Sequence, residues 1–304
     1  MKRNIYSYSK LWMILFVLMG AACTNQVEDA IPVSGQPIEF SVLSDWKEIP
    51  NTRLNDGKTQ FKDSDSIQIF GFHTSFPGGV KKVQKFMYRV GESARGQKVG
   101  FDGKDWNYSP KRFWPKEGTL DFYASYPDYS VLNEEDKMTY VQPDFNPLGV
   151  DLLWGLATNR DCAKARKGIV QIWMVHALAK VNIFFDSSLG DIKQAKVSAY
   201  KAGYFKNADN GVPIWHVDDK TDIIQATIPK EPTKIGDVTV FILPERITEL
   251  KLTLLNGTEI DASEEIKKHT FEAGKEYNLT ISKGVQKKNT NSRSIAMSVR
   301  CVSE

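Results

Sequence analysis

The four histidines are the first residues to consider for acid–base or metal chemistry, and they are scattered along the chain. His73, His176, His216 and His269 show neither His-x-x-x-His nor His-Glu-x-x-His spacing, which would set two imidazoles on one helix face for zinc. His176 stands within an apolar run, which is typical of a core or strand-end histidine with a satisfied hydrogen bond. The sequence therefore predicts no metal site and no cofactor.

Motifs for nucleophiles and phosphate binding are also missing from the sequence. It contains no Gly-x-Ser-x-Gly elbow, no phosphate-binding glycine loop and no Cys–His arrangement that sequence alone can assemble. Asp63 and Asp65 lack the spaced oxygen ligands and closing Glu of a calcium loop, so we interpret them as turn formers before a strand. We expect no catalytic residue and no enzyme activity.

The three cysteines are too few for a disulfide scaffold. Cys23 stands near the start of the chain, whereas Cys162 and Cys301 are far apart in the sequence. The last two could form a bridge in an oxidising compartment, or they could be separate small hydrophobic residues. The sequence leaves both alternatives open.

The first residues have the pattern of an export signal. Lys2, Arg3 and Lys10 lead into the uncharged run at residues 11–22, which is too short to span a bilayer comfortably, and Cys23 follows at once. This order resembles a bacterial lipoprotein lipobox, in which the cysteine is acylated and becomes the new N-terminus, although Gly20 stands where that motif prefers leucine.

The leader therefore predicts a lipoprotein. We expect residues 1–22 to be a signal peptide, Cys23 to carry a lipid anchor to the outer membrane, and residues 23–35 to form a polar tether. The alternative is an ordinary signal peptide whose cleavage site adjoins a cysteine.

The net charge depends on this leader. The whole chain carries 40 Lys and Arg against 37 Asp and Glu, but residues 1–22 contain three basic residues and no acidic one. The remainder thus has 37 residues of each sign and no net charge. A neutral chain gives no reason to propose nucleic acid or an anionic membrane surface as a partner.

Most of the remaining sequence has the period of β-strands. Ile38, Phe40 and Val42 alternate with polar residues, and residues 67–72 repeat the pattern after a turn-rich stretch. Residues 170–185 are rich in Val, Ile, Trp and Phe and predict two strands, 170–175 and 179–185, joined around His176. Short strands between Pro, Gly, Asn and Asp turns predict an all-β fold made of sandwiches.

Two composition shifts suggest the domain organisation. Charged residues interrupt the apolar pattern at 158–168, and residues 283–294 hold almost nothing to bury. We therefore predict an N-terminal β-sandwich at 36–165, a C-terminal β-sandwich at 166–282, and a polar linker with a final strand at 283–304.

That final strand pattern consists of Ile295, Met297, Val299 and Cys301, which alternate with other residues at the end of the polar segment. One interpretation is that it joins its own sheet or frays as a terminus. The other is that it is donated to another subunit by β-augmentation.

Several segments, taken in order, resemble the fimbrillin family of Bacteroidota surface lipoproteins, which includes major and accessory pilus subunits. The segments are Phe40-Ser41-Val42 with Thr52-Arg53, Asp65-Ser66-Ile67-Gln68-Ile69-Phe70, Phe113-Trp114-Pro115, Leu120-Asp121-Phe122-Tyr123-Ala124-Ser125-Tyr126-Pro127, Asp151-Leu152-Leu153, His176-Ala177-Leu178-Ala179-Lys180-Val181, Phe241-Ile242-Leu243-Pro244 and Phe271-Glu272-Ala273-Gly274-Lys275-Glu276-Tyr277. Each is weak alone, but their order spans nearly the whole exported chain. The resemblance implies two transthyretin-like β-sandwiches in tandem.

The resemblance also implies a mode of assembly. In pilus-forming members a protease cuts after an arginine that follows the first strand, and Arg53 matches that position. The cut would remove the strand at 38–42 and open a groove for the C-terminal strand of another fimbrial subunit, or of another copy of this chain. An exposed loop arginine also needs no role, and a tip or anchor subunit could keep its first strand.

The expected function is thus a cell-surface fimbrial subunit or fimbrillin-like adhesin at the outer membrane or in a fimbrium. A non-polymerising glycan-binding lipoprotein is the alternative, because Trp46, Trp106 and Trp215 could stack on sugar rings of host or bacterial glycans if they are exposed. The sequence does not distinguish stalk, anchor and tip roles.

Overall fold

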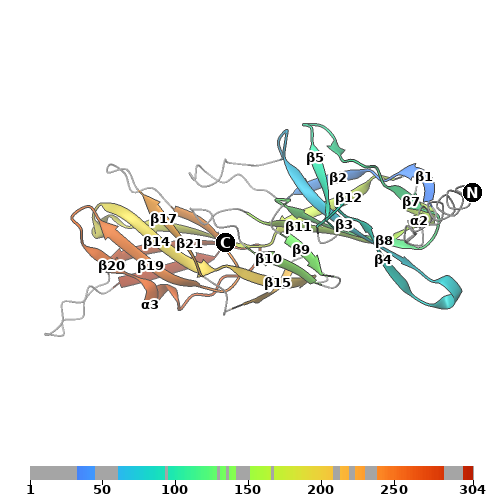
Figure 1. Cartoon of the computed structure of the whole chain (residues 1–304). Coiled ribbons are helices and arrows are strands. Elements are labelled where there is room, and N and C mark those ends of the chain that lie inside the picture. Colours follow the sequence, from blue (N-terminus) through green and yellow to red (C-terminus); the bar gives the residue numbers. More distant parts are fainter. Residues whose placement is uncertain are drawn as a thin grey trace, which may run out of the picture.

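The chain folds into β-strands arranged in several sheets (Figure 1). The computed structural model describes residues 33–44, 61–92, 95–128, 131–134, 137–141, 151–165, 168–207, 213–218, 223–229, 238–283 and 297–303. Helical elements in these ranges are single turns: α2 (Cys162–Ala165), α3 (Ser263–Ile266), η1 (Pro77–Gly79) and η2 (Ser187–Leu189). None of the described helices is long and apolar enough to cross a membrane. The predicted all-β fold class is confirmed.

The first half of the chain is organised around an eight-stranded sheet. Along its main path the strands follow the order β2 (Phe40–Ser44), β12 (Val170–His176), β11 (Leu153–Asp161), β8 (Thr119–Tyr126), β3 (Ser66–Ser75), β5 (Gln97–Phe101) and β6 (Trp106–Asn107), and β4 (Lys82–Met87) pairs with β3. A two-stranded sheet of β1 (Val33–Pro37) and β7 (Phe113–Pro115) lies beside it.

The period-two pattern decides which side chains of this sheet are buried. On β8, Leu120, Phe122 and Ala124 point into the first core, while Tyr123 stacks on Trp154 on the opposite face, with ring centroids 5.9 Å apart. Trp114 is buried, and its ring meets Phe122 edge to face at 6.1 Å.

The second half is a sandwich of two four-stranded sheets. One has the order β18 (Val238–Ile242), β13 (Ala179–Phe185), β21 (Glu276–Lys283) and β22 (Met297–Ser303); the other has β17 (Ile223–Pro229), β14 (Ile192–Tyr200), β19 (Ile247–Leu254) and β20 (Glu259–Asp261). Apolar residues from β13, β14, β19 and β21 form one buried cluster between the sheets.

A further sheet combines strands from both halves of the sequence. Its order is β16 (Pro213–Val217), β15 (Ala202–Asn207), β10 (Lys137–Val141) and β9 (Val131–Glu134), and Met138 on β10 is paired with Phe205 on β15. Phe205 packs in a third buried cluster with Trp154 from the first sheet and Phe241 from the second half. The two halves are therefore joined by backbone hydrogen bonds as well as by side-chain packing.

The two strands predicted at 170–175 and 179–185 are confirmed as β12 and β13, but they belong to different sheets. β12 pairs with β11 and β2, and its Ile172 and Met174 are buried in the first core. The chain thus passes from the first sheet to the second sandwich between His176 and Ala179. The strands on either side of the polar stretch 158–168, β11 and β12, are hydrogen-bonded neighbours in one sheet, and Cys162 is buried in the first core. The transthyretin-like assignment and the domain limits stay predictions.

Candidate functional site: two strands at sheet edges

The strand predicted at 38–42 is β2, and it lies at the edge of the eight-stranded sheet. Among the described strands it pairs with β12 alone, in parallel, from Val170 beside Phe40 to Met174 beside Ser44. Phe40 and Val42 are buried in the first core, whereas Leu43 points to the outer face. One strand thus combines a single hydrogen-bonding neighbour with a full set of core contacts.

The residues just before β2 hold it against the rest of the core. Ile38 is fully buried; its amide donates to Arg112 O at 2.9 Å, and its carbonyl accepts from the Tyr108 hydroxyl at 2.8 Å. Burial raises the pKa of Tyr108 further above neutral pH, so the phenol stays a hydrogen-bond donor over a wider pH range than an exposed tyrosine. Phe40 lies between Tyr108 and Phe122, with ring centroids 5.9 and 5.4 Å away. Withdrawal of β2 would leave an apolar trough and an unpaired edge on β12.

The predicted donor strand corresponds to β22, which starts at Met297. It pairs antiparallel with β21 at the edge of the second sandwich, where Val299 lies opposite Ile281 and Cys301 opposite Leu279. In this chain the strand therefore occupies its own sheet, the first of the two interpretations made above. With one neighbour among the described strands, it is held by one hydrogen-bond ladder.

Four of the residues named from the sequence lie outside the described residues: Cys23, Arg53, Trp46 and Ile295. Lipidation of Cys23 and proteolytic processing at Arg53 therefore stay predictions. Cys162 is a buried thiol that forms no disulfide, with its Sγ 3.9 Å from Arg160 O.

The four histidines have different partners. His73 is buried with Nε2 2.8 Å from Glu117 O, and His176 Nδ1 lies 2.8 Å from Asp151 Oδ2 where the chain leaves the first sheet. His216 stacks on Tyr204 with centroids 4.8 Å apart, and the His269 amide donates to Ile266 O in the turn after α3. Within the described ranges, no three His, Cys, Asp or Glu side chains form a group suited to a metal.

Asp65 has the structural role that its place before β3 predicts. Its Oδ2 accepts a hydrogen bond from the Lys62 amide at 2.8 Å, and its own amide donates to Lys62 O. This turn sets the start of β3.

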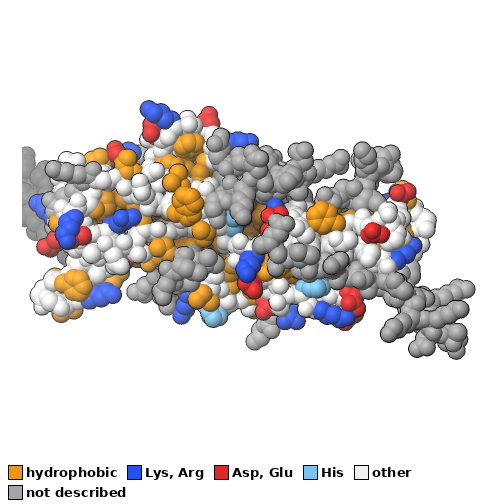
Figure 2. All heavy atoms as spheres, turned by 180° about the vertical axis from the view of Figure 1, so that it is seen from behind, with side chains coloured by type: hydrophobic (Ala, Val, Ile, Leu, Met, Phe, Trp, Pro, Cys, Tyr) orange, Lys and Arg blue, Asp and Glu red, His pale blue; other side chains and the backbone are white. Residues whose placement is uncertain are grey.

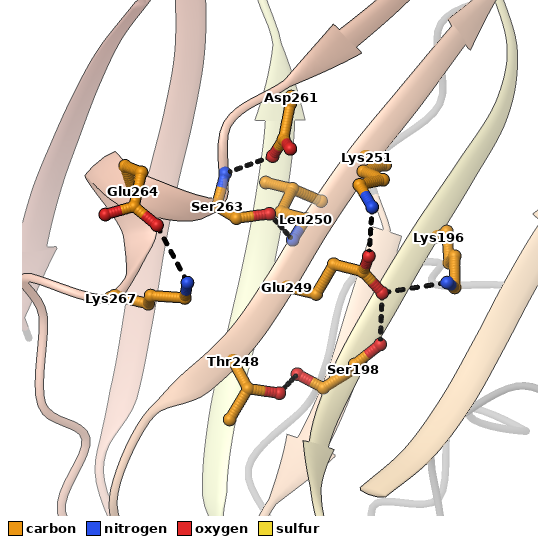
Figure 3. Close-up of polar contacts among 10 residues, drawn as sticks. All are labelled: Lys196, Ser198, Thr248, Glu249, Leu250, Lys251, Asp261, Ser263, Glu264 and Lys267. Atoms are coloured by element: carbon orange, nitrogen blue, oxygen red, sulfur yellow. Dashed lines mark hydrogen bonds and ion pairs between the residues drawn. The ribbon is translucent and has the colours of Figure 1, made fainter.

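A polar hollow of about 360 Å³ lies on the outer face of β14 and β19 (Figure 3). Glu249 is at its centre and accepts from Lys196 Nζ at 2.9 Å, from Lys251 Nζ at 2.5 Å and from Ser198 Oγ at 2.9 Å. These donors, the Lys196 ammonium first, lower the pKa of Glu249 to about 2.

The rest of the hollow is also internally paired. Asp261 accepts from the Ser263 amide at 2.9 Å, Ser263 Oγ accepts from the Leu250 amide at 3.1 Å, and Lys267 pairs with Glu264 at 2.8 Å. With its pKa lowered to about 2 by two ammonium groups and a hydroxyl, Glu249 is a weak proton acceptor at neutral pH. Ion pairs connect β14 with β19, and the hydrogen bond from the Leu250 amide to Ser263 Oγ connects β19 with α3.

The tryptophans named for sugar stacking are packed where they are described. Trp106 is buried against Phe61 and Phe101, with centroids 4.9 and 5.0 Å away. Trp215 packs on Phe205, and its Nε1 donates to Ala177 O at 2.7 Å. Neither ring forms an open platform.

Trp173 is the exposed aromatic residue that the sequence analysis missed. It is 57% exposed on β12, beside Leu43 at 52%, and it points away from the buried Ile172 and Met174. The alternation of Gln171 and Trp173 with those two buried residues could have revealed it, because period two places Trp173 on the polar face. The overall apolar character of residues 170–185 obscured this signal.

The comparisons with known proteins agree with the fold. The family model described as fimbrillin-like matches residues 52–296, so the chain belongs to the fimbrillin-like family. A search of curated proteins found no match.

Two solved structures share the fold. A candidate cell adhesion protein from Bacteroides uniformis is 16% identical, with 88% of this chain and 97% of that chain covered and a TM-score of 0.54. A candidate cell adhesion protein from Bacteroides ovatus is 14% identical, with 88% and 95% covered and a TM-score of 0.51.

Proposed function

We propose that the chain is a cell-surface fimbrial subunit or fimbrillin-like adhesin that is exported as a lipoprotein and assembles by β-strand exchange. Its partners are other fimbrial subunits or copies of itself, and its location is the outer membrane or a fimbrium. The fimbrillin-like match over residues 52–296 supports this class, as does the fold shared with two candidate cell adhesion proteins. In this proposal Cys23 carries the lipid anchor.

The observation that carries the proposal is the position of β2. This strand has one neighbour, β12, and buries Ile38, Phe40 and Val42 in the first core. Arg53 follows nine residues after Ser44, the end of β2. A cut after Arg53 would therefore separate β2 from the rest of the chain and allow it to leave, with the core otherwise intact.

A replacement strand must supply backbone groups to β12 and apolar side chains to the trough. Met297, Val299 and Cys301 recur at every second residue, the same spacing as Ile38, Phe40 and Val42. We take β22 to be this donor. Once β2 has left, the exchange breaks the ladder with β21 in one subunit and makes a new ladder with β12 in the next, so this step itself conserves the number of ladders.

The processing step is tested on protein isolated from outer membranes. We expect the N-terminal residue to be Leu54 and to become Cys23 in an Arg53→Ala variant. Recovery of wild-type protein that begins only at an acylated Cys23 would contradict processing.

The exchange step is tested with two chains that start at Leu54. One extends to Glu304 and the other ends at Lys283, so that they differ in β22 and the segment before it. We expect electron microscopy to show polymers of the first and none of the second. If the longer chain stays monomeric, strand exchange is refuted.

The exposed Trp173 supports glycan binding as a second candidate function. A flat indole ring on an open sheet face suits stacking on a sugar. Saturable binding on a glycan array by the monomer, abolished by Trp173→Ala and retained by Trp215→Phe, would favour this function. Absence of sugar binding by the wild-type monomer would rule it out.

A further inference from the structure

The hairpin formed by β3 and β4 projects from the end of the molecule that is remote from the second sandwich (Figure 1). Pairing with β8 ends at Thr74, and pairing between β3 and β4 ends at Ser75 with Lys82. The tip between them contains η1, where Gly78 and Gly79 adopt φ values of 60° and 83°. A Cβ atom added to either glycine would meet no atom within 4 Å, so the tip is surrounded by open space.

This tip exposes apolar side chains. Phe76 is 60% exposed, Val80 69% and Val83 42%, although all three are residues that proteins commonly bury. In Figure 2 the same hairpin, at the lower left, shows hydrophobic side chains next to basic ones.

The charge of the hairpin is of one sign. Lys81, Lys82 and Lys85 follow the apolar tip, and no acidic residue occurs between Ser66 and Gly91. The chain after residue 22 has no net charge, but this hairpin is therefore positively charged. Lysines just behind a protruding apolar tip are the arrangement by which peripheral proteins bind anionic lipid surfaces.

We propose that the tip of the β3–β4 hairpin is a contact site for a bilayer with anionic phospholipid headgroups. Phe76 and Val80 enter the boundary between headgroups and acyl chains, and Lys81, Lys82 and Lys85 lie at the level of the phosphates. A bilayer suits this shape better than a folded protein does, since a stable protein interface needs about 800 Å² on each partner, contributed by 20–30 residues. A convex turn of about ten residues falls short of that, whereas lipid deforms around it.

The position of β1 is compatible with this contact. β1 pairs with β7 at the same end of the molecule as the hairpin (Figure 1). A chain held in a membrane by residues that precede β1 would present this end to the lipid. The hairpin contact does not require lipidation of Cys23, however, and it can be tested without it.

The first experiment measures vesicle binding by the chain from residue 24 onward, which keeps every described residue and lacks Cys23. We expect it to bind phosphatidylcholine vesicles that contain phosphatidylglycerol, to bind phosphatidylcholine alone far more weakly, and to dissociate at high ionic strength. Replacing Lys81 and Lys82 by Gln removes two charges and should weaken binding by roughly 30-fold.

Matched variants at the opposite end of the molecule are the controls. Lys267→Gln with Lys268→Gln also removes two adjacent lysine charges, and Leu255→Ser also removes an exposed apolar side chain from a turn. We expect these to bind like the wild type, whereas Phe76→Ser with Val80→Ser binds several-fold more weakly. Equal binding by hairpin and control variants, or no binding by the wild type, would overturn the proposal.

A second experiment measures how deeply the hairpin tip enters the bilayer. In vesicles whose acyl chains carry bromine, the Phe76→Trp variant should show more fluorescence quenching than the wild type, and the Leu255→Trp variant should not. Both sites are exposed, so the variants are expected to keep the wild-type fold, which circular dichroism checks. Unchanged quenching of Phe76→Trp would refute insertion of the tip.

Discussion

The ring of Phe40 meets the ring of Phe122 edge to face at 5.4 Å, and this contact joins the edge strand β2 to the centre of the first sheet. An edge strand held mainly by its hydrogen bonds could leave at little cost. Phe40 makes the departure of β2 costly, because an aromatic side chain buried in a core is among the largest single contributions to stability.

The Phe40→Ala substitution should lower the free energy of unfolding by about 3–5 kcal/mol. Leu43→Ala is the matched control, since Leu43 is on the same strand but exposed, and it should change stability by less than about 0.5 kcal/mol. Urea unfolding of both variants measures the difference. Equal losses would show that β2 is not held by its core face.

Gly118 should tolerate alanine far less well than Gly257 does. Both have positive φ, 84° and 83°, so each substitution carries a backbone strain of about 1–2 kcal/mol. A Cβ on Gly118 would also lie 2.4 Å from Thr74 O and 2.6 Å from His73 Nε2, whereas at Gly257 it would meet nothing within 4 Å. We expect Gly118→Ala to lose about 1–3 kcal/mol more than Gly257→Ala in thermal or urea unfolding.

Stability should fall in acid through Glu249. Its pKa is lowered to about 2, chiefly by the Lys196 ammonium, so its stabilising contribution is complete above the unfolded-state pKa near 4.5. The contribution is lost as pH falls toward 2. The urea midpoints of the wild type and Glu249→Gln should therefore differ most at neutral pH and converge between about pH 4.5 and 2.

The control for this pH dependence is Glu264→Gln. Within the hollow, Glu264 pairs with Lys267 and its side chain is largely exposed, so its removal should matter little at any pH. A difference between the wild type and Glu249→Gln that does not change with pH would contradict the assignment.

Trp215→Phe should cost about 1–2 kcal/mol of stability, because the Nε1 donor to Ala177 O is lost while most ring packing is kept. Trp173→Phe, on an exposed face, should have no measurable effect. The difference between the unfolding free energies of the two variants measures how much the hydrogen bond from the Trp215 indole to the Ala177 carbonyl contributes to stability.

Local patterns in the sequence were sufficient to locate strands but not to predict which strands pair with each other. Alternation placed β2, β3, β12 and β13 well, because every second residue of a strand lies on the same face and shares its burial. The parallel pairing of β2 with β12 joins residues more than a hundred positions apart, and no local pattern encodes it. Likewise, the polar residues at 158–168 signalled exposure, but exposure alone does not tell whether the flanking strands share a core.

The candidate site was anticipated at its two strands and missed elsewhere. The first strand and the final strand both stand at sheet edges, which suits the exchange inferred from the family resemblance. The exposed Trp173 was hidden within the apolar stretch 170–185, and the sequence analysis drew nothing from the residues of the β3–β4 tip. Their exposure depends on which neighbours the fold supplies, and that information is three-dimensional.

The pairing of β10 with β15 has a mechanical consequence. Met138 through Val141 lie opposite Phe205 through Ala202, so a sheet spans both halves of the chain. Bending or stretching at the junction would have to rupture backbone hydrogen bonds of that ladder. We therefore expect the junction to resist force better than a single connecting segment would.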